Sequence, residues 1–243
     1  MWHYVIPSLV TCTGIVLGFA SITESAAGHT DSAAWLILIC VLLDKVDGSA
    51  ARVLKGSSQF GIELDSLSDL ITFGLAPAVL VTCAVGNTHH LLPQPYAAYL
   101  TRGCAALYVV AAALRLAKFN VITRPGDRYF FGIPTTVVGG LLCCYYLTVR
   151  KYQLDPVFIR VLPLILLAMA LLMVSRIPLR KPALTPWRPI NGLIILNVVC
   201  IFICPVLRIL PEYLLTVGGS YVVVGATWST LAGVRPPAPN TTA

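Results

Sequence analysis

Charged residues are scarce in this chain. Only 11% of its 243 residues are Asp, Glu, Lys or Arg, whereas a soluble domain carries about 25%. Hydrophobic residues make up 57% of the sequence, and its mean hydropathy is +0.83. This composition excludes an ordinary soluble globular protein and predicts an integral membrane protein.

Cysteine pairs of the metal-binding kind are absent as well. The chain has eight cysteines, but they lie in apolar segments and form no CxxC pair. This argues against zinc and redox sites built on that motif. We expect the cysteines to pack among apolar neighbours as small hydrophobic side chains.

Long polar segments are also missing, so little sequence remains for a separate soluble domain. The hydrophobic runs have about the length that a membrane-crossing helix needs. We expect eight spans, at residues 5–22, 33–54, 66–86, 97–119, 132–149, 157–175, 190–208 and 212–232. The predicted fold is all-α, a polytopic transmembrane helical bundle, and the Pro-rich residues 233–243 are expected to form a disordered tail.

Basic residues are distributed unevenly between the two ends of these spans. With the N-terminus inside, the inner ends and loops hold eleven Lys and Arg and the outer ones hold five. Cytoplasmic loops of membrane proteins carry such an excess, so we expect both termini in the cytoplasm. The net charge of +7 then indicates anionic lipid head groups and phosphates as partners, not nucleic acid.

Acidic residues are rarer still, and five of the ten lie within residues 42–74. On helices, Asp44 and Asp47 share one face, and Asp65 and Asp69 share another. The short connection makes the two helices antiparallel neighbours, so the four carboxylates converge. They can lie together near lipid only around a cation, and oxygen ligands favour a hard ion such as Mg²⁺, Mn²⁺ or Ca²⁺.

Small residues and an arginine follow the first two carboxylates. Gly48 and Ala51 clear the helix face, so that a flat group or a phosphate can approach the backbone. Arg52 offers a fork of donors for a phosphate. Together with a metal, these features indicate a site for a pyrophosphate-linked nucleotide. The alternative is a set of salt bridges at a helix end, which the full pattern disfavours.

The complete pattern reads Asp44-x2-Asp47-Gly48-x2-Ala51-Arg52-x8-Gly61-x3-Asp65-x3-Asp69. It resembles the signature of the CDP-alcohol phosphotransferase family, whose members transfer a phosphatidyl or similar group from a CDP-alcohol to an acceptor hydroxyl and release CMP. The resemblance implies a six-helix core, usually homodimeric, with its site facing the cytoplasm. We assign residues 1–182 to this core and residues 183–232 to two additional helices.

The resemblance also implies roles for individual residues. Asp44, Asp47, Asp65 and Asp69 would hold one or two Mg²⁺ or Mn²⁺ ions, and Asp69 would be the base that takes the acceptor's proton. The residues expected to bind CDP are Gly48, Ala51, Arg52, Gly61, Ser57 and Thr11. In the first span, Ser8 and Gly14 stand where the family often has asparagines.

The segment "FGIELDSLSDLITFGLAPA" resembles the family members that use L-serine. Members that use glycerol phosphate typically have Pro and Lys at the positions of Ser66 and Leu70. The implied reaction converts CDP-diacylglycerol and L-serine into phosphatidylserine and CMP, a step of phospholipid biosynthesis. Residues expected to contact the acceptor or a phosphate are Arg115, Lys118, Asn120 and Thr135.

Two alternatives remain open at this point. The first is the same chemistry with another acceptor, such as choline, inositol or glycerol phosphate. The second is an ion-coupled transporter whose intramembrane acids bind cations. A transporter predicts acids at several depths of the bilayer, whereas those in residues 42–74 gather at two adjoining span ends.

Overall fold

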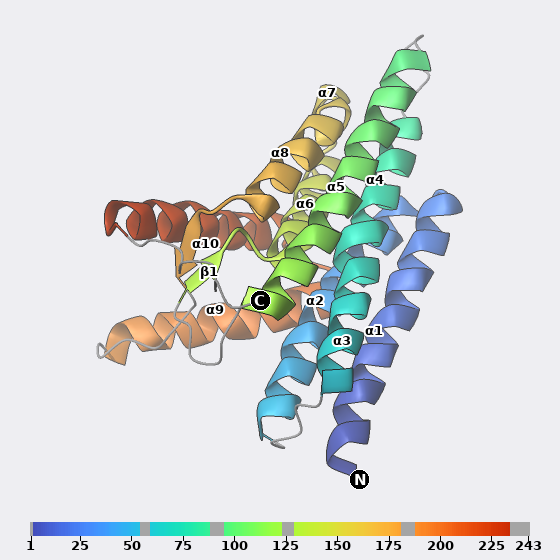
Figure 1. Ribbon diagram of the computed structural model, residues 1–243. Helices are drawn as coiled ribbons and strands as arrows, with labels where there is room; N and C mark the ends of the chain where they lie inside the picture. The colour runs from blue at the N-terminus through green and yellow to red at the C-terminus, as the bar shows by residue number, and fades with distance from the viewer. Residues whose placement is uncertain (1, 54–58, 88–94, 123–128, 181–187, 234–243) are drawn as a thin grey trace.

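The computed structural model describes residues 2–53, 59–87, 95–122, 129–180 and 188–233, which form a bundle of helices (Figure 1). Within these residues, five helices are long and apolar enough to cross a membrane. They are Ser8–Ala26, Gln59–Gly86, Ala97–Val121, Val157–Val174 and Pro211–Leu231. The predicted all-α membrane fold is confirmed. Of the eight expected spans, those at residues 33–54, 132–149 and 190–208 form helices that are not among these five in the described part of the chain.

The first two helices form an antiparallel pair. Helix α1 (Trp2–Ala26) and helix α2 (Thr30–Val53) are joined by a three-residue turn, in which Gly28 adopts a φ of +90°. The Ser21 hydroxyl donates to the Ala33 carbonyl at 3.0 Å and ties the pair together. Helix α1 extends beyond the predicted span of residues 5–22, because the polar residues that follow continue the same helix.

The third span is one continuous rod of three parts. Helix α3 (Gln59–Asp69) leads into a π-helix (η1, Leu70–Leu75) and then helix α4 (Ala76–Gly86). The rod begins seven residues before the predicted residue 66, because its first two turns are polar and hydropathy does not distinguish them from a loop. The predicted loop between the second and third spans is correspondingly shorter.

The core of the bundle lies between the middle helices. Helix α5 (Pro95–Ile122) packs against helix α8 (Leu162–Val174), and helix α6 (Thr135–Lys151) packs against α2. A single-turn helix, α7 (Val157–Arg160), leads into α8. The fully buried side chains include Phe73, Tyr108 and Tyr146, which pack among buried aliphatic side chains such as Leu142 and Leu166.

A short two-stranded ribbon was not predicted. Strand β1 (Tyr129–Phe131) pairs antiparallel with strand β2 (Pro178–Arg180), and Phe130 lies opposite Leu179. The ribbon joins the segment before α6 to the segment after α8, which are about 50 residues apart in sequence. Three-residue strands leave no recognisable alternation in a sequence, so this pairing could not be inferred from the pattern.

The last two helices cross the direction of the main bundle. Helices α9 (Arg188–Leu207) and α10 (Pro211–Leu231) lie across the other helices and extend to the left in Figure 1. Helix α10 approaches its neighbours through glycines, because a Cβ atom on Gly218 would lie 3.0 Å from Leu141 and one on Gly225 would lie 2.8 Å from Leu179. The division into a core at residues 1–182 and an addition at residues 183–232 stays a prediction.

We predict that Gly132→Ala destabilises the fold by about 2–5 kcal/mol, the sum of left-handed strain and overpacking. Gly132 precedes α6 with a φ of +81°, and a Cβ atom there would lie 2.2 Å from the Met173 carbonyl oxygen. The measurement is the fraction of monodisperse protein that survives a heating series in detergent. Gly103→Ala is the matched control, since a Cβ atom at Gly103 meets nothing within 4 Å. Equal melting of the two variants would contradict this description of the turn.

Candidate active site

Three of the four predicted carboxylates meet between α2 and α3, and both of these helices pack against α1. Asp44 comes from α2, and Asp65 and Asp69 come from α3. One ligand atom from each lies within 4.8 Å of the others, and all three residues are half-buried. The backbone of Asp47 follows one turn later on α2, but its side chain lies outside the described part of the structure. The spacing of 4 residues on α3 therefore directs two carboxylates toward the one from α2.

A small cavity lies among these carboxylates. Its volume is about 10 Å³, close to what a single water molecule needs. Its lining includes the three carboxylates together with Gly14, Cys40, Leu43, Ser68, Thr72 and Phe73. Carboxylate oxygens around a space of this size fit a divalent ion such as Mg²⁺ or Mn²⁺. The residues present therefore fit the metal that the sequence pattern implies.

Two basic side chains act on this acidic cluster. The Lys45 ammonium lies 2.9 Å from a carboxylate oxygen of Asp44, and most of the Lys45 side chain is exposed. Arg115, buried on α5, interacts electrostatically with Asp69 and Asp44. Three carboxylates thus face two described basic groups. The remaining negative charge favours a bound cation.

Helix α1 closes one side of the site. The Ser68 hydroxyl donates to the carbonyl of the buried Thr11 at 3.3 Å, so Thr11 lies beside the turn of α3 between Asp65 and Asp69. A Cβ atom on Gly14 would lie 3.1 Å from the Ser68 hydroxyl oxygen. A small residue at position 14 therefore lets α1 approach α3 at the turn that carries Asp69. Sequence reasoning did not give Gly14 a role, because Ser68, against which it packs, is 54 residues away in the sequence.

The π-helix begins directly after Asp69, a feature that the sequence did not reveal. A π turn widens the helix and leaves carbonyls without their usual partners, and such turns are frequent at functional sites. Here the Phe73 carbonyl accepts a hydrogen bond of 2.7 Å from the fully buried Tyr108 hydroxyl of α5. Gly139 of α6 lies against Phe73 on another side, where a Cβ atom would be only 3.2 Å away. Neighbouring helices thus hold the wide turn behind the carboxylates.

The predicted CDP-binding residues are partly described. Gly48 is exposed on α2 one turn beyond Asp44, and a Cβ atom there would meet nothing within 4 Å. This open surface beside the cluster would admit a flat or phosphate-bearing group. Gly61 is half-buried in the first turn of α3. Ser57 and the side chains of Ala51 and Arg52 lie outside the described residues.

The residues predicted to contact the acceptor form two groups, one at Arg115 and Thr135 and the other nearer the end of α5. Arg115 donates through Nη1 to the hydroxyl oxygen of Thr135 at 3.1 Å, and both residues are buried. The Nε atom of Arg115 is buried and has no hydrogen-bond partner in the described part of the chain. Arg115 is therefore a buried cation near the carboxylates, and its Nε–H group could donate a hydrogen bond to a ligand.

The other two acceptor candidates lie closer to the end of α5. The Asn120 amide nitrogen donates to the Ser66 hydroxyl at 2.9 Å and lies 3.4 Å from a Glu63 carboxylate oxygen. Asn120 therefore ties α5 to α3 in this structure. Lys118 is exposed, one helical turn beyond Arg115. Glu63, which lies off the face of Asp65 and Asp69, supports this contact between the two helices.

Comparison with known proteins gives a consistent result. The family model for CDP-alcohol phosphatidyltransferases matches residues 4–175. A Helicobacter pylori protein (strain ATCC 700392 / 26695) named CDP-diacylglycerol–serine O-phosphatidyltransferase is 36% identical over 151 residues, 62% of this chain and 60% of that protein. A Bacillus subtilis protein of the same name is 33% identical over 156 residues, 64% of this chain and 80% of that protein.

An archaeal protein matches this chain over a comparable length. The archaetidylserine synthase of Methanothermobacter thermautotrophicus is 33% identical over 174 residues, 71% of this chain and 68% of that protein. The match to the Helicobacter pylori protein spans only about three fifths of that protein's length. The family match includes all the carboxylates described above and ends before α9.

Proposed function

Because this chain belongs to the CDP-alcohol phosphatidyltransferase family, we propose that it transfers the phosphatidyl group of CDP-diacylglycerol to the hydroxyl of L-serine. The products are phosphatidylserine and CMP. The observation that carries this proposal is the meeting of Asp44, Asp65 and Asp69 within 4.8 Å at the junction of two helices. The names of the three relatives described above all refer to serine, which favours serine as the acceptor.

The carboxylates would hold one or two Mg²⁺ or Mn²⁺ ions, with Asp47 as the fourth ligand. A bound divalent ion supplies positive charge that neutralises the pyrophosphate and the CMP leaving group. Asp44 and Asp65 would orient the pyrophosphate through that charge. Gly48 and Ala51 would let the nucleotide approach α2, and Arg52 would donate to a phosphate. Gly61, Ser57 and Thr11 would complete the CDP side of the site.

Transfer exchanges one phosphorus–oxygen bond for another. The serine hydroxyl oxygen attacks the phosphorus that carries the diacylglycerol. The bond from that phosphorus to the bridging oxygen breaks, and CMP leaves with the bonding electrons. The proton of the serine hydroxyl passes to the Asp69 carboxylate. Asp69 suits this task because it lies one turn beyond Asp65, at the start of the π-helix.

The buried Arg115 gives a physical reason for choosing an amino acid as the acceptor. Its Nε donor has no partner among the described residues, and its guanidinium lies near the cluster that holds Asp69. A carboxylate bound at this guanidinium would bring the serine hydroxyl close to the base. Thr135 would orient the guanidinium through its 3.1 Å hydrogen bond. Lys118 and Asn120 would lie farther out, on the approach to the site.

We also propose a location and an assembly, both of which the resemblance to the family implies. With the termini in the cytoplasm, the ends of α2 and α3 that hold the carboxylates face the cytoplasm, where serine and CMP are dissolved. The diacylglycerol chains would remain in the membrane between helices. We further propose that the protein works as a homodimer in the cell membrane.

The test is a CMP-release assay with purified protein in detergent, CDP-diacylglycerol and a panel of single acceptors. We expect release with L-serine to exceed release with glycerol phosphate, inositol or choline by at least about 10⁴-fold, because a site built to bind a polar group rejects analogues that lack it. Preferential release with another acceptor would overturn the serine assignment but keep the transferase class. Absence of release with every acceptor would overturn both.

A further inference from the structure

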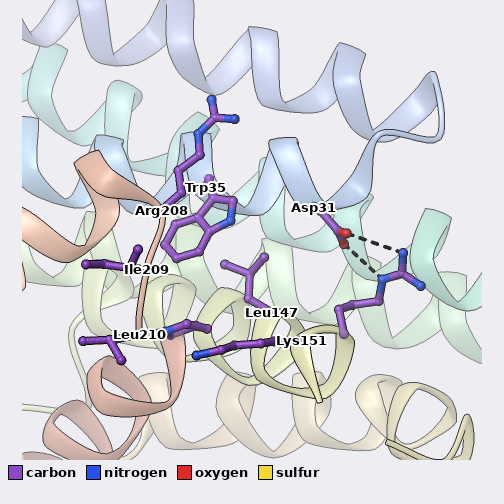
Figure 2. Close-up of a pocket in the computed structure, with 9 residues that line it drawn as sticks. Asp31, Trp35, Leu147, Lys151, Arg208, Ile209 and Leu210 are labelled. Carbon is purple, nitrogen blue, oxygen red and sulfur yellow. Dashed lines mark hydrogen bonds and ion pairs between the residues drawn. The ribbon is translucent and has the colours of Figure 1, made fainter. Parts of the chain in front are cut away.

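A larger cavity lies at the other end of α2 from the carboxylates. Its volume is about 620 Å³, within the range of small-molecule sites. Three segments that are far apart in sequence line it: the start of α2, the end of α6 and the turn between α9 and α10 (Figure 2). The nine lining residues are Asp31, Trp35, Leu147, Arg150, Lys151, Arg208, Ile209, Leu210 and Pro211. We call this cavity the distal pocket.

The distal pocket is separate from the proposed transfer site. Asp31 and Asp44 are 13 residues apart on one helix, which corresponds to about 20 Å along its axis. None of the residues that line the distal pocket lines the small cavity among the carboxylates. With the carboxylates at the cytoplasmic side, the distal pocket faces the opposite leaflet.

Among the described residues around the distal pocket, the basic side chains outnumber the acidic ones by one. Arg150 pairs with Asp31 through Nε at 3.1 Å, and Lys151 pairs with Glu212 at 2.6 Å. Arg208 forms no ion pair with any residue that the structure describes, and its side chain is exposed. Three basic and two acidic groups thus leave a net charge of +1, which matches a ligand with a single negative charge.

Arg208 is held by the turn between α9 and α10 in an unusual backbone conformation. Arg208 has a φ of 54° and Leu210 has a φ of 52°, although neither is glycine. Such conformations are uncommon for residues with a side chain, and they persist only where the surroundings enforce them. The turn places Ile209 and Leu210 in the wall of the pocket beside Arg208.

The remaining wall is apolar and ends at a buried aromatic ring. In Figure 2, Trp35 lies between Arg208 and Leu147, and the ion pair of Asp31 lies beyond them. Trp35 is only 8% exposed. A soluble anion would leave this apolar wall unused, whereas a phospholipid can place its phosphate at Arg208 and hydrocarbon against Trp35 and Leu147.

We propose that the distal pocket binds an anionic phospholipid with a single phosphodiester charge, with the phosphate at Arg208. The two ion pairs fix the ends of α2, α6 and α10 around the lipid. The lipid would hold the α9–α10 pair against the bundle from the leaflet opposite the transfer site. This binding is independent of the transfer reaction and requires no nucleotide, metal or serine.

The test uses the fluorescence of Trp35. The full chain is mixed in detergent micelles with phosphatidylglycerol that carries brominated acyl chains, or with phosphatidylcholine that carries the same chains. The quenching that disappears in Trp35→Phe is assigned to Trp35. We expect phosphatidylglycerol to quench Trp35 at a lower mole fraction than phosphatidylcholine. Arg208→Gln should raise the half-quenching mole fraction for phosphatidylglycerol about fivefold, as expected from the loss of one basic contact, and leave phosphatidylcholine unchanged.

Arg102→Gln is the matched control, since Arg102 is an exposed arginine that does not line the distal pocket. Brominated phosphatidylglycerol should quench Trp35 in this variant at the same mole fraction as in the wild type. Equal quenching by the two lipids, or equal behaviour of the two arginine variants, would overturn the proposal. A competition arm adds soluble glycerol phosphate. Displacement of the lipid at millimolar glycerol phosphate would assign the pocket to a free phosphate and overturn the lipid assignment.

Discussion

Asp65→Asn is expected to reduce serine-dependent CMP release by about a thousandfold or more. Asp65 contributes one of three carboxylates that lie within 4.8 Å of one another. An amide in its place removes a negative charge and a strong ligand for a hard cation. The loss corresponds to several kcal/mol of transition-state stabilisation by a bound metal, at about 1.4 kcal/mol for each factor of ten.

The measurement compares initial rates of CMP release at saturating Mg²⁺ or Mn²⁺. Asp155→Asn is the matched control, because Asp155 is exposed in the loop before α7 and accepts a local hydrogen bond that Asn can also accept. Its rate should equal that of the wild type. Size-exclusion profiles of both variants should match the wild type. A folded Asp65→Asn protein that retained a tenth of the wild-type rate would show that this carboxylate is not an essential ligand.

Asp69→Asn is expected mainly to slow the transfer step, whereas Arg52→Ala is expected mainly to weaken donor binding. Asp69→Asn should slow transfer by about 10²–10⁴-fold, the usual contribution of a general base, while donor binding stays near normal. Arg52→Ala should mainly weaken donor binding and lower the rate less at saturation, because it removes a contact made before and during the reaction. The contrast separates proton transfer from nucleotide binding.

The two variants require paired measurements. CDP competition in the presence of metal reports donor binding, and single-turnover rates with serine report transfer. If Asp69→Asn loses donor binding as completely as Asp44→Asn does, Asp69 is primarily a metal ligand. Another group must then accept the serine proton.

The meeting of the carboxylates could be predicted because it depends on local periodicity. The step of four residues places Asp65 and Asp69 on one helical face, and the short connection lets the rod that begins with α3 pack against α2 through η1 and α4. The five long apolar helices follow from composition in the same way. The sequence predicted that these carboxylates meet, and the structure adds that Asp44, Asp65 and Asp69 lie within 4.8 Å of one another.

The supporting structure around the site could not be predicted, because it depends on contacts between distant segments. The hydrogen bond from Tyr108 to Phe73 stabilises a π-helix that has no sequence pattern of its own. The ribbon between β1 and β2 rests on a pairing about 50 residues apart. Arg115 donates to Thr135 across 20 residues; both were expected to contact the acceptor or a phosphate, but their contact with each other was not predicted.

The proposal that the carboxylates hold a catalytic metal is tested most directly by measuring serine-dependent CMP release with and without a divalent ion. Purified protein is stripped with EDTA, assayed with CDP-diacylglycerol and L-serine, and assayed again after Mg²⁺ or Mn²⁺ is added back in excess. We expect no release above background with the chelator and full recovery on addition of either ion, since three carboxylates within 4.8 Å require a cation for function. Undiminished release in excess EDTA would contradict the proposal.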